Sequence, residues 1–253
     1  MWKIGRGPLC ALLVAGAATV SIAGAEQVPR SGSVGTKAGW REWPARRGGG
    51  DGRDTMWNDL RQHAASPWVS YPDHAVTAHE NAHLLNGDVA AHFKRPVGLY
   101  LGGGRAFVLD EPPVRADRVR AAIPRDLRGS RYAVYVAKVR DGAVVDGVYE
   151  EWVCYVHGAR AAVEWRNRDG PSDLAFAQLE MAVYGTAVLE VVERDAPDWP
   201  QLPQLRELTA LLVQRSWYYY KLGAQFEQFN WIGGDHVRRL RADKIYDRMP
   251  APR

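Results

Sequence analysis

The stretch "TAHENAHLLNGD", residues 77–88, contains two histidines four positions apart and a glutamate directly after the first. In an α-helix, residues four apart differ in direction by only about 40°, so His79 and His83 would project side by side from one face. Two imidazoles in that arrangement can bind one Zn²⁺ ion, and Glu80 can act beside the ion as a general base. Such a site requires a helix at this place and a third protein ligand from elsewhere in the chain.

The sequence around the two histidines predicts the required helix. Pro72 and Asp73 are residues typical of a helix start. Apolar residues recur at helical spacing between positions 75 and 85, and Asn86 followed by Gly87 predicts the end of the helix.

Most of the remaining ordered sequence also has a helical pattern. Further helices are predicted near 55–65, 148–159, 173–193 and 204–222, with a mainly helical segment at 115–139 whose second half could instead be a strand. Two short apolar runs at 97–101 and 105–109, joined by three glycines, predict a β-hairpin. We therefore expect a mainly α fold with a small β element, an α+β fold.

The amino terminus has the features of a secretory signal peptide. Lys3 and Arg6 precede an apolar run, which ends in small residues before Glu26. Cleavage near Ala25 predicts a secreted or periplasmic protein with no membrane association after cleavage, and an uncleaved membrane anchor is the alternative.

The chain after the signal peptide divides by composition into two parts. Residues 26–54 are rich in Gly, Arg, Ser and Pro, which predicts a flexible linker. Residues 55–253 form the predicted domain. After cleavage its single cysteine, Cys154, cannot form an internal disulfide and is interpreted as a small buried residue. The formal net charge of +4 is too small to predict a nucleic-acid partner.

A catalytic zinc ion needs a third protein ligand and one open position. The sequence "YEEW" places Glu150 and Glu151 on the predicted helix 148–159. Glu151 is favoured because it falls at near-helical spacing from Tyr155 on an otherwise apolar helix, where an exposed acid is unexpected. Glu150 and His92 remain as alternatives.

Four stretches carry a resemblance to known proteins: "VTAHENAHLLNGD", "LYLGGGRAFVLDEPP", "IPRDLRGSRYAVYV" and "YEEWVCYVHGA". In this order they resemble secreted bacterial proteins that have a helical HExxH motif and a later (D/E)EW…Y…GA helix. The layout is similar to the gluzincins, a group of zincin metallopeptidases, and more loosely to the metallopeptidase domain of anthrax lethal factor. The resemblance covers about residues 55–222. It implies a zincin-like active-site helix with a second ligand-bearing helix, with these roles: His79, His83 and Glu151 as zinc ligands, and Glu80 as general base.

Tyr155 departs from the gluzincin pattern. Gluzincins of the thermolysin kind have an aspartate four residues after the third ligand, where this chain has the tyrosine. A tyrosine there could donate a hydrogen bond to the oxyanion of a reacting substrate, and His157 is the alternative donor. By analogy with other peptidases, the hairpin could also offer an edge for an extended peptide.

The function predicted from these features is a secreted zinc-dependent hydrolase, most simply a peptidase that acts on a peptide or protein substrate. The alternative is a catalytically inactive zincin-like module that serves in binding or in the cell envelope. The two differ at Glu80, because metal binding needs the histidines whereas turnover also needs the base.

Overall fold

The computed structural model describes residues 38–47, 55–140, 147–166 and 174–226. The predicted signal peptide, residues 1–25, lies outside the described residues, as do most of the predicted linker and the end of the predicted domain. Within the described ranges, no helix is both long enough and apolar enough to cross a membrane.

Helices dominate the described residues, together with a small sheet, which confirms the prediction of a mainly α fold with a small β element. The helices are α1 (Met56–His63), α2 (His74–Phe93), α3 (Ala116–Ala122), α4 (Ser130–Tyr135), α5 (Gly147–Glu164), α6 (Leu174–Asp195) and α7 (Leu202–Gly223), with a 3-10 turn, η1, at Arg125–Leu127. The strands are β1 (Trp40–Glu42), β2 (Val97–Gly102) and β3 (Arg105–Leu109), and both hairpin strands were predicted.

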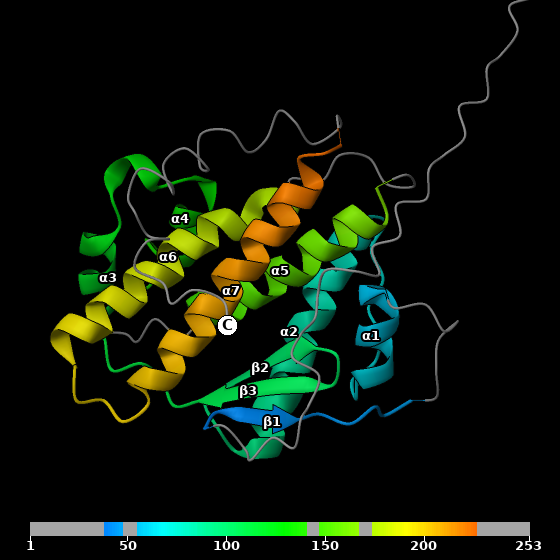
Figure 1. The fold of residues 1–253 in the computed structure, drawn as a ribbon, viewed down its shortest axis with the longest axis horizontal. Helices are drawn as coiled ribbons and strands as arrows, with labels where there is room; N and C mark the ends of the chain where they lie inside the picture. The colour runs from blue at the N-terminus through cyan, green and yellow to red at the C-terminus, as the bar shows by residue number, and fades with distance from the viewer. Residues whose placement is uncertain (1–37, 48–54, 141–146, 167–173, 227–253) are drawn as a thin grey trace, which may run out of the picture. The chain divides into compact units, whose positions relative to one another are not determined.

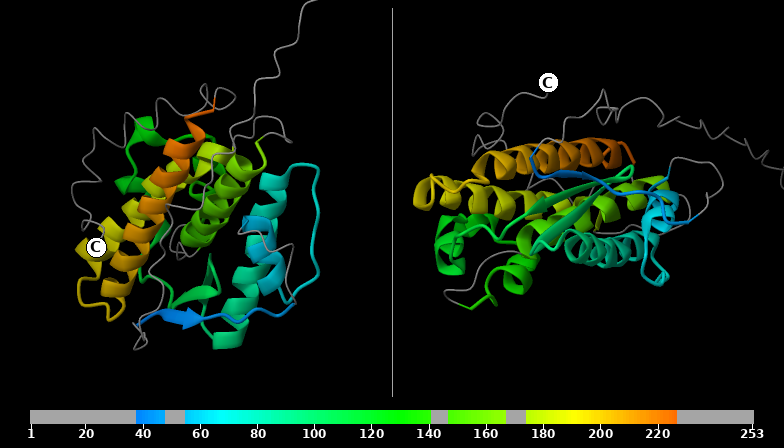
Figure 2. Two further views of the ribbon diagram at one scale, coloured as in Figure 1. Left: turned by 45° about the vertical axis from the view of Figure 1, so that its right-hand side comes forward. Right: turned by 90° about the horizontal axis from the view of Figure 1, so that it is seen from below.

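Four long helices, α2, α5, α6 and α7, pack against one another (Figure 1). α6 and α7 form an antiparallel pair, and α5 contacts α2 on one side and this pair on the other. The sheet lies across α2, as Figure 2 shows from two further directions. α5 is therefore the central helix, which explains why most of its residues are buried.

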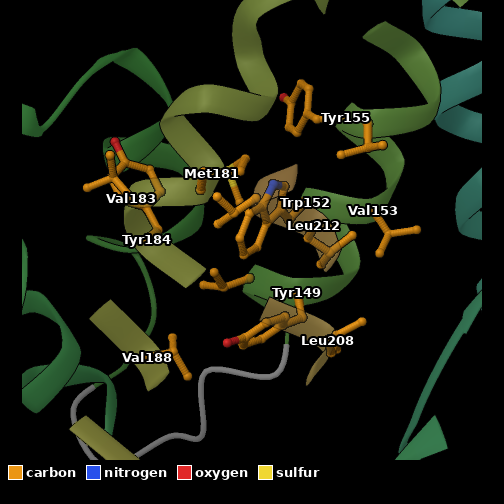
Figure 3. Packing of buried hydrophobic residues seen from close by; sticks show 14 of the residues in the cluster. Tyr149, Trp152, Val153, Tyr155, Met181, Val183, Tyr184, Val188, Leu208 and Leu212 are labelled. Atoms are coloured by element: carbon orange, nitrogen blue, oxygen red, sulfur yellow. The ribbon is translucent and has the colours of Figure 1, made fainter. Parts of the chain in front are cut away.

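The side of α5 that faces α6 and α7 is fixed by two large aromatic residues (Figure 3). The Tyr149 hydroxyl donates to the Gly185 carbonyl oxygen at 2.9 Å and lies 2.6 Å from the Thr209 hydroxyl. Trp152 Nε1 donates to the Ser216 hydroxyl at 2.9 Å. The Tyr149 hydroxyl and the Trp152 N–H both have hydrogen-bond partners inside the core, so the two rings can be buried there. Their contacts fix the rotation of α5 about its own axis.

β1 corrects the predicted linker. The strand lies within 26–54 and pairs antiparallel with β3, so that Trp40 is opposite Phe107. Trp43, just after the strand, is only 1% exposed, and its Nε1 donates to the His63 carbonyl oxygen at 3.1 Å. The segment has few apolar residues, but the burial of its two tryptophans is enough to order it against the domain. The strand was missed in the sequence because three residues are too few to show a periodic pattern.

α2 is longer than the sequence predicted. It continues through Asn86 and Gly87 to Phe93 and ends where Lys94 takes a left-handed conformation with φ 52°. An exposed glycine inside a helix costs about 0.5–1 kcal/mol relative to alanine. Val89, two residues further on, is fully buried, and the burial of such a side chain contributes more than that cost.

Candidate metal centre

The position of the two histidines is set by the start of α2. The Asp73 carboxylate accepts hydrogen bonds from the backbone N–H groups of Ala75, at 2.7 Å, and Val76, at 3.3 Å. This cap satisfies N–H groups that have no partner within the helix and fixes where the first turn begins. His79 and His83 then follow one and two turns later, as the sequence predicted for a helix.

Small residues let α2 and α5 approach closely beside His79. A Cβ atom added to Gly158 of α5 would lie 3.2 Å from the Ala75 carbonyl oxygen and 3.6 Å from the His79 Cβ atom. Ala78 and Ala82 of α2 are also fully buried. The side chains of α5 can therefore reach the histidines of α2 directly.

Three polar atoms from the two helices meet at one place. The Nε2 atoms of His79 and His83 lie 3.2 Å apart, and Oε2 of Glu151 lies 3.6 Å from each of them. A circle through points with these separations has a radius of about 2.0 Å, which is close to the usual length of a zinc–nitrogen bond. The three atoms could thus all ligate one metal ion.

The Glu151 carboxylate lies in an unusual environment for a charged group. Its Oε2 atom is buried and accepts no hydrogen bond within the described part of the chain. A buried carboxylate oxygen without a partner is costly, because it has lost its hydration without compensation. A metal ion at the point shared with the two imidazoles would supply the missing interaction.

Glu150 approaches the opposite side of the His83 ring. Its Oε1 atom accepts a hydrogen bond from Nδ1 of His83 at 3.0 Å. Because a carboxylate can only accept, Nδ1 carries a proton. In the neutral form of His83, which is the form that binds a metal ion, the lone pair of Nε2 then points toward Glu151. Sequence reasoning left Glu150 and Glu151 as competing ligands, and the structure places them on different nitrogens of one histidine.

The two histidines differ in their electrostatic surroundings. Burial and the neighbouring charges of His83 and Arg131 lower the pKa of His79 to about 3. Burial also acts against a charge on His83, but the neighbouring Cys154 side chain and the carboxylates of Glu150 and Glu151 raise the pKa of His83 far above its usual value. The acids around His83 thus stabilise positive charge at this place, whether a proton or a bound cation carries it.

Tyr155 lies against the metal-binding group. Its ring centroid is 4.4 Å from that of His79, and its hydroxyl is 2.9 Å from the hydroxyl of Tyr135 on α4. The Arg131 guanidinium, also on α4, lies 4.9 Å from the centre of the Tyr155 ring. Sequence reasoning selected Tyr155 but missed Tyr135 and Arg131, because nothing in the pattern of a short helix says which neighbour it packs against.

α4 is held in place by a buried acid of α6. The Glu180 carboxylate is 4% exposed and accepts hydrogen bonds from the backbone N–H groups of Arg131, at 2.8 Å, and Tyr132, at 3.2 Å. The Tyr184 hydroxyl donates to the same carboxylate. Since these bonds satisfy the first turn of α4, they also fix the direction in which Tyr135 points.

Glu80, the predicted general base, lies on α2 directly after His79 and is partly exposed. It takes no part in the hydrogen bonds and ion pairs that join His79, His83, Glu150 and Glu151. Its carboxylate therefore remains available for a role other than ligation.

The alternative ligand His92 lies away from the metal-binding group. His92 is exposed near the end of α2, where its ring contacts those of Trp43 and Phe93. Cys154 is buried, as expected, and accepts a hydrogen bond from the Asn86 side-chain amide at 3.4 Å. Burial raises the pKa of the Cys154 thiol to about 12, which makes it a poor nucleophile.

His157, the alternative donor to an oxyanion, instead supports the sheet. Its Nε2 atom donates to the Tyr100 carbonyl oxygen at 2.7 Å, and burial lowers the pKa of His157 to about 4. Asn86 accepts from the Tyr100 backbone N–H at 2.7 Å. These bonds use the outer backbone groups of β2 at Tyr100, so the hairpin does not offer a peptide a free edge there.

A comparison of this chain with protein-family models, with curated proteins and with solved structures found no match. The resemblance to the gluzincins therefore stays a prediction, and the function must be inferred from the geometry of the site.

Proposed function

We propose that this protein is a zinc-dependent hydrolase with a zincin-like site, in which His79, His83 and Glu151 bind the metal. The observation that carries the proposal is the arrangement of Glu151 Oε2, buried and without a hydrogen-bond partner in the described residues, at 3.6 Å from both Nε2 atoms. Two imidazoles and one carboxylate are a ligand set of catalytic zinc sites, which keep a further position open for water or substrate.

Bound zinc would supply Lewis acidity, which lowers the pKa of water toward about 7 and polarises a substrate carbonyl. Glu80 is the residue that accepts the proton of the attacking water, since it is next to a ligand in sequence but outside the ligand group. Tyr155 donates a hydrogen bond to the developing oxyanion. Its hydroxyl and that of Tyr135 carry two protons and share one mutual hydrogen bond, so one proton remains for the substrate.

Peptides or proteins are the substrates that we infer for this site, and the compartment is the periplasm or the exterior of the cell. The substrate class follows from the resemblance of the motifs to metallopeptidases, and the compartment follows from residues 1–25. The second candidate is a zincin-like module that binds zinc without turnover. It would need His79, His83 and Glu151 as much as the enzyme does, but it would not need Glu80.

The substitution Glu80→Gln separates these two functions. Glutamine keeps the size of the side chain and removes the proton acceptor, so zinc content and melting temperature should stay near those of the wild type. Hydrolysis of a mixed peptide library, followed by mass spectrometry of the products, should fall by on the order of 10²-fold or more. His83→Ala should lose zinc and activity together, and Glu190→Gln, an exposed glutamate of α6, serves as the control.

Each outcome has a distinct meaning. Loss of zinc in Glu80→Gln to the same extent as in His83→Ala would make Glu80 a ligand or a structural group. Full activity in Glu80→Gln would overturn the proposed mechanism. Zinc binding by the wild type without cleavage of any library peptide would favour the binding module.

A further inference from the structure

Two acids that are adjacent in the sequence contact opposite nitrogens of one imidazole. Glu150 Oε1 is 3.0 Å from Nδ1 of His83, whereas Glu151 Oε2 is 3.6 Å from Nε2 of the same ring. Consecutive residues of a helix differ in direction by about 100°, so the two carboxylates diverge and enclose the ring of His83 between them. The hydrogen bond at Nδ1 ties the orientation of the ring to α5, and it leaves Nε2 facing Glu151.

Resting on the proposed zinc site, we propose that Glu150 is a positioning residue that sets the zinc affinity through His83. In the neutral form of His83, which is the form that binds a metal ion, its hydrogen bond keeps the proton on Nδ1, and it aims Nε2 at the point shared with His79 and Glu151. A carboxylate on the far nitrogen also makes the imidazole a stronger ligand. Glu150 itself does not contact the metal.

His79 shows the contrast. Its Nδ1 atom is buried, and no carboxylate of the described residues hydrogen-bonds to it. The ring is held instead by packing: the Tyr155 ring lies against it, and its Cβ atom lies close to Gly158. The two imidazoles are therefore oriented by different interactions. Packing orients His79, whereas a hydrogen bond to a charged carboxylate orients His83.

The exposure of Glu150 makes the proposal testable without damage to the fold. Its side chain is 40% exposed, and the His83 side chain is 25% exposed. Removal of the carboxylate therefore leaves Nδ1 of His83 accessible to water rather than buried without a partner. The metal-free variant should fold as well as the wild type, and any loss of affinity then reports on the zinc site.

The experiment measures the zinc affinity of the full chain by competition with a chromophoric chelator, for the wild type, Glu150→Ala and Glu150→Gln. Loss of a carboxylate that orients a metal-bound histidine typically weakens metal binding by about 10–100-fold, and we expect Glu150→Ala in this range. Glu150→Gln should lose less, since its amide oxygen can still accept the hydrogen bond. The visible bands of bound Co²⁺ should keep their intensity, because the three ligands remain. Glu190→Gln controls for the loss of one negative charge.

Three results would overturn the proposal. Equal zinc affinity in the wild type and Glu150→Ala, with the hydrolytic activity intact, would reject the role of Glu150 and leave the proposed function standing. Complete loss of zinc in Glu150→Ala, as in Glu151→Ala, would make Glu150 a ligand. A wild type that binds no zinc would reject the proposed function and this inference together.

Discussion

Gly158 of α5 lies against the backbone of α2 at Ala75, so close that a Cβ atom on the glycine would be 3.2 Å from the Ala75 carbonyl oxygen. The same added atom would be 3.2 Å from Leu174 at the start of α6. α2 and α5 thus leave little room for a side chain beside His79, so the size of residue 158 affects how the two ligand-bearing helices meet.

Gly158→Val should therefore push the two helices apart. Insertion of extra methyl groups into a packed interface typically costs about 1–3 kcal/mol, and we expect a loss in the free energy of unfolding of this size, measured with urea. Zinc affinity should fall as well, because the distance between Glu151 and the histidines would increase. Gly87→Val is the matched control: a Cβ atom there meets nothing within 4 Å, so stability should change by less than about 0.5 kcal/mol. Equal stability in the two variants would contradict this packing argument.

A second buried cluster should make stability depend on pH. Asp59 Oδ1 accepts hydrogen bonds from the Tyr100 hydroxyl at 2.7 Å and from the Gly103 N–H at 3.1 Å, and it lies 3.1 Å from Nδ1 of His63. Burial alone would raise the pKa of Asp59, but the hydrogen bonds with His63 and Tyr100 hold it below its usual 3.8. Burial alone would lower the pKa of His63, but the hydrogen bond with Asp59 holds it above its usual 6.5.

The two pKa shifts define a window of pH. The ionised Asp59 contributes to the free energy of unfolding above pH 3.8, and this contribution is lost as the pH falls through the lowered pKa of Asp59 in the folded protein. The protonated His63 contributes fully to the free energy of unfolding below pH 6.5, and this contribution is lost as the pH rises through the raised pKa of His63 in the folded protein. The stability difference between the wild type and Asp59→Asn should therefore be largest between these values, at roughly 1.5–3 kcal/mol. A difference that stays constant from pH 3 to pH 9 in urea titrations would contradict the pairing.

The two tyrosines of the site should be unequal in their kinetic roles. Tyr155→Phe removes the proposed donor to the oxyanion, and we expect kcat to fall by about 10²-fold with little change in KM. Tyr135→Phe removes only the partner of that hydroxyl and should lower kcat by less than about tenfold. Zinc content should be unchanged in both variants. A larger loss of kcat for Tyr135→Phe than for Tyr155→Phe would assign the donor to Tyr135 instead.

Much of the fold could be predicted from local patterns. The spacing of apolar residues predicted α5, α6 and α7, and the cap at Thr55 predicted α1, because these signals lie within each element. β1 and the last turns of α2 were missed, since Trp40 and Val89 are ordered by contacts with residues distant in sequence. Tertiary burial outweighed local composition in both places.

The candidate site could be predicted in part. Helix geometry predicts that His79 and His83 project from one face. Glu151 was predicted as the third ligand because an acid is unexpected on an otherwise apolar helix. The choice between Glu150 and Glu151 could not be made firmly, because it depends on the rotation of α5, which Tyr149 and Trp152 fix from the opposite face. Tyr135 could not be found at all, since its place depends on how Glu180 holds α4.

The proposal of a zinc hydrolase depends first on the metal, and analysis of the metal content of the full chain tests it most directly. The protein, stripped with a chelator and then supplied with zinc at neutral pH, should retain one zinc ion per chain after gel filtration. Glu151→Ala, His79→Ala and His83→Ala should each retain much less, whereas Glu190→Gln should equal the wild type. A wild-type chain that retains no stoichiometric zinc, or a Glu151→Ala variant that retains as much as the wild type, would contradict the assignment of the site.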